Sequence, residues 1–317
     1  MTDFLSLATK TLSPFQENKL YLSFSKEFAN GSPKAYGLFH LIWFGVFILI
    51  ATLMIIFFKN PSKGNTKLIF FSFWLILFVV ELLKQIYGSG RDFSTWKNHP
   101  EFIPLMLCSM PLYIIPIYLL IPSKYEKASN AFLSYLSVFN LWCGLFVMFY
   151  PGDVFIANIF ISNHTMIYHG ILMALGLWTA FRKIVKFNLE TFMWAGIVFI
   201  VEYSLITMGN EIIYQLKDKT NYWPNLFNMS HRKPSPFFSD IPGVKDLKPW
   251  MTTILYVPAT FFGAFTFYTI IWGMSLPMDL LEKAISKRIK IKKAMIAKNS
   301  LVLANENEIK NTQENQE

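Results

Sequence analysis

Hydrophobic residues in this chain of 317 residues are gathered into long runs instead of being spread at regular intervals. Seven runs of about 20 to 27 residues are separated by polar segments, and each is long enough to cross about 30 Å of hydrocarbon as a helix. The pattern predicts an all-α fold class: a polytopic membrane helix bundle with about seven transmembrane helices. The predicted spans are residues 35–58, 68–87, 102–121, 131–150, 160–181, 191–213 and 250–276.

The basic residues predict which way the helices run. Most lysines and arginines of the short loops follow the first, third and fifth spans, and short loops rich in these residues stay in the cytoplasm. We therefore expect the N-terminus outside and the C-terminus in the cytoplasm. The predicted organisation is an N-terminal extracytoplasmic segment (1–34), a seven-helix transmembrane domain (35–276) with an outer loop (214–249), and a cytoplasmic tail that is first basic and then disordered (277–317).

Composition narrows the class of protein further. Charged residues make up only 15% of the chain and hydrophobic residues 53%, whereas a soluble domain carries about 25% charged residues. The net charge of +9 comes from loops and the tail, which favours membrane lipids, and the anionic inner leaflet in particular, over nucleic acid as a partner. The expected location is the cell membrane, as a multi-pass protein of a bacterial plasma membrane, and no protein partner is indicated. Two cysteines cannot form a disulfide framework.

Several ionisable or polar side chains lie inside the predicted spans, where their burial is costly and therefore suggests function. In the predicted orientation most of them lie about 5 to 15 Å below the outer interface, which predicts one shared pocket that opens outward. Each also has a structural interpretation: Glu81 can pair with Lys84, and His40 can bond a neighbouring helix. His164 and His169 are five residues apart, so both cannot point at one centre. The candidates are His40, Glu81, Cys108, His164, His169, Glu202 and Asn210.

The stretch PLMLCSMPLYIIP (104–116) combines three prolines with one of the two cysteines. Within a helix, Pro111 and Pro116 would each leave a carbonyl without its amide partner, at Leu107 and Leu112. Such an opened backbone predicts that the segment forms the wall of a cavity, with the Cys108 thiol beside it. Motifs for metal sites, phosphate-binding glycine loops and serine hydrolases are absent from the sequence, so we expect neither a metal nor a cofactor.

A set of motifs in fixed order is similar to a known family. IPLMLCSMPLY, LWCGLFVMFYPGD, HTMIYHGILMALG, TNYW and RKPSPFFSD follow one another along the chain. Together they resemble the YwaF-type integral membrane family of bacteria, which is related to a eukaryotic transmembrane family associated with acyl transfer on ether phospholipids. The resemblance covers about residues 36–273. Met106 stands where the family has a histidine.

The resemblance implies a lipid acyltransferase or lipid-remodelling enzyme with a Cys–His site formed by Cys108, His169 and Glu81. A thiol nucleophile needs a base, and either His169 or His164 would serve, oriented by Glu81 or Glu202. Alternatives are a transporter or small-ligand-binding membrane protein that uses the same pocket, and a non-catalytic accessory subunit. The residues expected to bind substrate, for example a phosphate headgroup, are His40, His164, Glu202, Asn210, Asn221, Tyr222, Arg232 and Lys233.

Overall fold

The computed structural model describes residues 23–88, 104–122, 124–151, 154–216, 225–226, 230–233, 238, 242–244 and 246–314. The described chain is built from helices, which confirms the predicted all-α fold class. The helices are α3 (Leu38–Phe57), α4 (Lys63–Leu83), α6 (Pro111–Leu120), α7 (Glu126–Phe149), α8 (Ile159–Phe181), α9 (Leu189–Leu216) and α10 (Pro249–Glu314).

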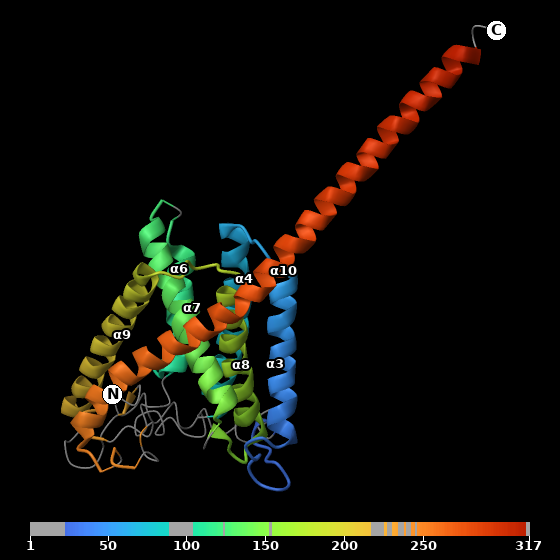
Figure 1. Cartoon of the computed structure of the whole chain (residues 1–317). Coiled ribbons are helices and arrows are strands. Elements are labelled where there is room, and N and C mark those ends of the chain that lie inside the picture. Colours follow the sequence, from blue (N-terminus) through green and yellow to red (C-terminus); the bar gives the residue numbers. More distant parts are fainter. Residues whose placement is uncertain are drawn as a thin grey trace. The chain divides into compact units, whose positions relative to one another are not determined.

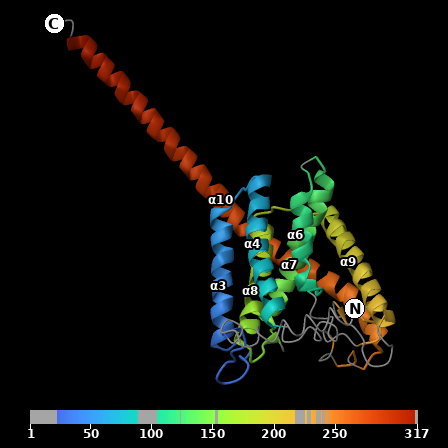
Figure 2. The ribbon, with the colours of Figure 1, turned by 180° about the vertical axis from the view of Figure 1, so that it is seen from behind.

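Helix α8 lies at the centre of the first compact unit, which ends at Ile271. It packs between α3 and α7, α7 packs in turn against α9, and α4 contacts both α6 and α8 (Figures 1 and 2). Glycines allow α7 and α8 to approach closely: a Cβ atom on Gly176 would lie 2.5 Å from the Cα of Leu141. Small residues at such crossings are the usual means of packing helices in membranes.

Among the described residues, five helices are long and apolar enough to cross a membrane: α3, α4 with its extension to Ile86, α7, α9 and α10 over Pro249–Ser300. Exposed apolar side chains such as Leu41, Leu49 and Leu205 cover the outer faces of α3 and α9, as expected for contact with lipid. Helix α8 is buried along most of its length, because other helices pack around it. Seven spans and their orientation remain predictions.

The third predicted span differs from the observed structure. The prediction of one continuous helix over residues 102–121 is wrong. Helix α6 begins only at Pro111 and follows a 3₁₀ turn at Leu107–Ser109. Pro111 occupies the first helical position, where an amide has no helical acceptor to lose. The carbonyl of Leu107 accepts a hydrogen bond from the Met110 amide, 3.3 Å away, so it is not stranded as the sequence predicted.

Pro116 does interrupt α6, and the freed carbonyl finds a partner on another helix. The indole Nε1 of Trp74 on α4 donates a hydrogen bond to the Leu112 carbonyl, at 2.9 Å. At the end of the same helix, the ammonium of Lys67 donates to the carbonyls of Leu119 and Ile121, at 3.0 and 2.7 Å. Side chains of α4 therefore replace backbone bonds that α6 cannot make.

Replacing Trp74 with phenylalanine is expected to lower the free energy of unfolding by about 1 to 2 kcal/mol, because the Leu112 carbonyl would lose its donor in a dry environment. Trp194→Phe is the matched control, since the Trp194 indole is half-buried and its Nε1 donates only an exposed hydrogen bond to Glu190, at 3.4 Å. Unfolding in mixed micelles measures both variants. Equal losses in the two would contradict the role given to Trp74.

Residues Trp272–Glu317 form a second compact unit. Within it α10 continues to Glu314, and so into the later part of the tail (277–317), which the sequence predicts to be disordered. The segment 278–314 contains neither glycine nor proline and is rich in Ala, Lys, Glu and Leu, which favour the helix. The apolar side chains of Ile285, Ile289 and Ile296 are exposed along it.

Candidate functional site

A buried carboxylate lies near the end of α4 and binds three side chains. Oε2 of Glu81 accepts a hydrogen bond from Nε2 of His164 on α8, at 2.9 Å. Its Oε1 pairs with the Lys84 ammonium at 2.7 Å and accepts from the Gln85 amide at 2.5 Å. The side chain of Glu81 is only 5% exposed, so these contacts replace nearly all of its hydration. Glu81 therefore forms the predicted ion pair with Lys84 and also joins α4 to α8 through His164.

The two histidines of α8 have different surroundings, as their spacing predicted. His164 is held by Glu81 and stacks on the ring of Tyr168, with centroids 5.1 Å apart. Nδ1 of His169 lies 2.9 Å from the carbonyl of Thr165. A carbonyl can only accept, so Nδ1 carries the proton and Nε2 of a neutral His169 keeps its lone pair. His169 is thereby oriented as a base, with its acceptor nitrogen uninvolved in that contact.

Cys108 lies in the 3₁₀ turn that precedes α6, and this turn packs against both α7 and α8. The thiol is half-buried beside Ser109 and within range of the charges of Lys84 and Glu81. In the described part of the chain no hydrogen bond joins Cys108 to His164 or His169. The turn therefore brings the thiol to the end of the bundle that holds the Glu81–His164 pair, without a direct contact to either imidazole.

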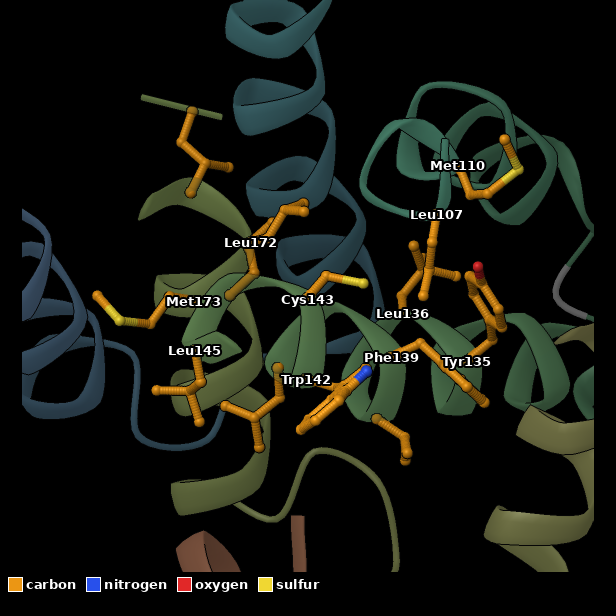
Figure 3. Close-up of a cluster of buried hydrophobic side chains, with 14 of the residues drawn as sticks. Leu107, Met110, Tyr135, Leu136, Phe139, Trp142, Cys143, Leu145, Leu172 and Met173 are labelled. Carbon is orange, nitrogen blue, oxygen red and sulfur yellow. The ribbon is translucent and has the colours of Figure 1, made fainter. Parts of the chain in front are cut away.

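Most side chains around the second cysteine are apolar, although Glu202 on α9 also lies nearby. Cys143 on α7 is buried, and Figure 3 shows its sulfur directed toward Leu136 and Leu107 within the core cluster. This environment agrees with a packing role and provides a natural control for any experiment on Cys108.

His40 is fully engaged by the backbone. Its Nδ1 accepts a hydrogen bond from the Tyr36 amide at 3.0 Å, so Nε2 carries the proton and donates to the Met148 carbonyl, also at 3.0 Å. The Tyr36 hydroxyl donates to the next carbonyl, that of Phe149, at 2.6 Å. His40 thus ties the start of α3 to the end of α7, which is the structural alternative that the sequence left open.

Asn210 and Arg232 connect the loop that follows α9 to the end of that helix. The Asn210 amide exchanges two hydrogen bonds with the backbone of Leu226, at 2.8 and 3.1 Å. The Arg232 guanidinium binds both carboxylate oxygens of Glu211, and its centre lies 3.9 Å from the ring centroid of Tyr214. We call these contacts, Asn210–Leu226 and Arg232–Glu211, the latch. They occupy the side chains of Asn210 and Arg232, which the sequence predicted to bind substrate.

The remaining loop candidates add little to the site. Asn221 and Tyr222 lie outside the described residues, and Lys233 follows the latch in an exposed turn.

Glu202 is a buried polar residue of α9 and has no contact with the Glu81–His164 pair among those found in the described chain. Its carboxylate faces the Tyr135 hydroxyl, and Cys143 on α7 lies nearby. The structure thus separates the candidates into the Glu81–His164–His169–Cys108 group, the Glu202 group, the Asn210–Arg232 latch and His40.

Sequence reasoning did not single out Tyr168 or Tyr135, which stand beside His164 and Glu202. Tyrosines are frequent in apolar spans, so nothing in the pattern marks these two. Within the described ranges, no group of three or more His, Cys, Asp or Glu side chains is arranged to hold a metal ion.

The sequence of this chain matches the model of one known protein family. The model of the TMEM164 family matches residues 35–271, which include every residue of the Glu81–His164–His169–Cys108 group. The chain belongs to the TMEM164 family. No curated protein and no solved structure matches it. The match ends where the first compact unit ends, so the helical tail from Trp272 lies beyond the part shared with the TMEM164 family.

Proposed function

We propose that the protein is a membrane-embedded lipid acyltransferase in which Cys108 carries the acyl group and α8 supplies the base. One observation carries the proposal: a buried carboxylate–imidazole pair lies on α4 and α8, and the turn with the thiol packs against α8. Met106 replaces the family's histidine in that turn, so the base comes from another helix. His169 fits this role, because its Nε2 is left as the acceptor nitrogen.

The proposed reaction has two balanced steps. In the first, the Cys108 thiol gives its proton to the imidazole, and the sulfur attacks the ester carbonyl of a donor phospholipid. The ester C–O bond breaks, the leaving hydroxyl takes the proton back, and a thioester remains on the sulfur. In the second, the hydroxyl of an acceptor lysophospholipid attacks the thioester. Its proton passes through the imidazole to the departing sulfur, which regenerates the thiol.

Glu81 is proposed as a positioning residue for α8. Its hydrogen bond fixes the ring of His164, which stacks on Tyr168 next to His169. Lys84 pairs with the same carboxylate, so Glu81 is itself held in place.

Glu81→Gln and His169→Gln are each expected to lower acyl transfer about a hundredfold, since a positioned base contributes about 10²- to 10⁴-fold. Transfer of a labelled acyl chain between phospholipids in liposomes measures the rate. Glu211→Gln is the matched control, because Glu211 belongs to the latch and its loss should leave the rate within about threefold. Full activity in both test variants, with normal folding, would rule out this base.

Glu202 favours a second function, the recognition of a small polar ligand by a transporter-like cavity. A carboxylate that is buried inside a membrane-spanning helix and accompanied by the Tyr135 hydroxyl is by default a candidate ligand site. Liposome uptake that depends on Glu202, and proceeds equally in Cys108→Ala, would support this function over acyl transfer.

A further inference from the structure

A basic cavity lies at the opposite end of the bundle from Cys108, and the proposed acyl transfer does not use it. Its volume is about 380 Å³, within the range of small-molecule sites. Helices α4 and α7 begin at this cavity, while α3 and α8 end there. Five basic residues line it: Lys59, Lys63, Lys67, Arg182 and Lys183.

The side chains that line the cavity are mainly positively charged. Against five cationic side chains, Glu126 is the one carboxylate among the lining residues, and it pairs with Lys63. The ammonium of Lys67 is fixed by two backbone carbonyls of α6 and lies 5.5 Å from the ring centroid of Tyr118. Two helix N-termini (α4 and α7) and two helix C-termini (α3 and α8) meet at the cavity, so the helix dipoles largely cancel and the attraction for an anion comes from the basic side chains.

Lys183 occupies a position where the backbone favours glycine. It has φ 52°, and the amides of Lys183 and Ile184 bond the carbonyls of Ala180 and Thr179, which is the Schellman arrangement that ends a helix. A lysine in this left-handed conformation is less stable than glycine would be. The chain nevertheless carries a cation here, and its side chain lines the cavity.

We propose that this cavity binds the phosphate group of an anionic ligand, either a lipid headgroup or a free phosphate compound. The sequence predicts that this end faces the cytoplasm, where the inner leaflet carries anionic lipids. A second hollow of about 190 Å³ shares Asn130, Leu133 and Ile184 with the first, but it adds both Lys186 and Glu190, so the basic surface is centred on the first cavity.

Native mass spectrometry of the full-length protein in detergent tests the proposal. The probes are dioctanoyl phosphatidic acid, inorganic phosphate as competitor, and dioctanoylglycerol, which has no phosphate. Lys59→Gln combined with Lys183→Gly is expected to weaken phosphatidic acid binding roughly tenfold. Lys183→Gly relieves the left-handed backbone, so this variant should melt no earlier than the native protein while it binds less.

Two further variants test whether positive charge drives binding and whether the ligand binds in this cavity. Glu126→Gln removes the one lining carboxylate and is expected to tighten binding severalfold. Lys287→Gln combined with Lys290→Gln removes the same number of charges from the tail and should leave binding unchanged.

The outcomes separate clearly. If inorganic phosphate displaces phosphatidic acid at a concentration close to that of the lipid, the cavity recognises a free phosphate compound; if displacement needs a large excess of inorganic phosphate, the cavity recognises the lipid headgroup. The proposal is overturned if phosphatidic acid binds no better than dioctanoylglycerol, if the cavity variants bind like the native chain, or if the tail variant loses as much as they do.

Discussion

Cys108→Ser is expected to reduce acyl transfer between phospholipids at least about a thousandfold, because the hydroxyl lacks the acidity and nucleophilicity of the thiol that carries the acyl group. The side chain keeps nearly its size, and the 3₁₀ turn at Leu107–Ser109 should keep its shape. The measurement is the initial rate of transfer in liposomes that contain a labelled donor phospholipid and an unlabelled lysophospholipid acceptor.

Cys143→Ala is the control for that experiment. Cys143 is the other cysteine of the chain and lies among apolar side chains of the core (Figure 3). Its loss should cost some stability and leave the rate within about threefold. A Cys108→Ser protein that transfers acyl chains as fast as Cys143→Ala would remove the thiol from the reaction.

Gly144→Ala is expected to have the largest effect on stability, a loss of about 3 kcal/mol or more. A Cβ atom at Gly144 would lie 2.2 Å from the amide nitrogen of Met173 and 2.9 Å from the carbonyl oxygen of His169. Both atoms belong to the backbone of α8, so no side-chain rotation relieves the clash. Helices α7 and α8 must separate, which also displaces His169 and should abolish activity.

Gly45→Ala is the matched comparison, since Gly45 also lies within an apolar helix and a Cβ atom there meets nothing within 4 Å. Alanine is favoured over glycine in a helix by about 1 kcal/mol, so this variant should be as stable as the native protein or more so. Unfolding of both variants in mixed micelles measures the difference. Equal stability of the two would show that the α7–α8 crossing is looser than described.

The positions of the helices and several site contacts follow from the sequence. Runs of apolar residues locate the helices because membrane spans need a fixed length of hydrocarbon-soluble chain. The spacing of His164 and His169 predicts different directions on α8, and the structure gives them different partners. The Glu81–Lys84 pair follows from its i, i+3 spacing on one helix.

Contacts between distant segments could not be predicted from these patterns. The choice of His164 as the partner of Glu81 depends on how α4 packs on α8, and periodicity does not specify it. The start of α6 at Pro111 was missed because an apolar run does not show where a helix begins inside it. Trp74 offers no local signal that its indole replaces a bond broken by Pro116 on another helix.

Intact-protein mass spectrometry followed by peptide mapping tests the central claim most directly. The native chain, reconstituted with a phospholipid that carries one defined acyl group and no acceptor, should gain the mass of that acyl group on the peptide containing Cys108. The modification should be released by hydroxylamine, as a thioester is. An unmodified Cys108 peptide under conditions where acyl transfer proceeds, or an acyl group on a different residue, would contradict the account.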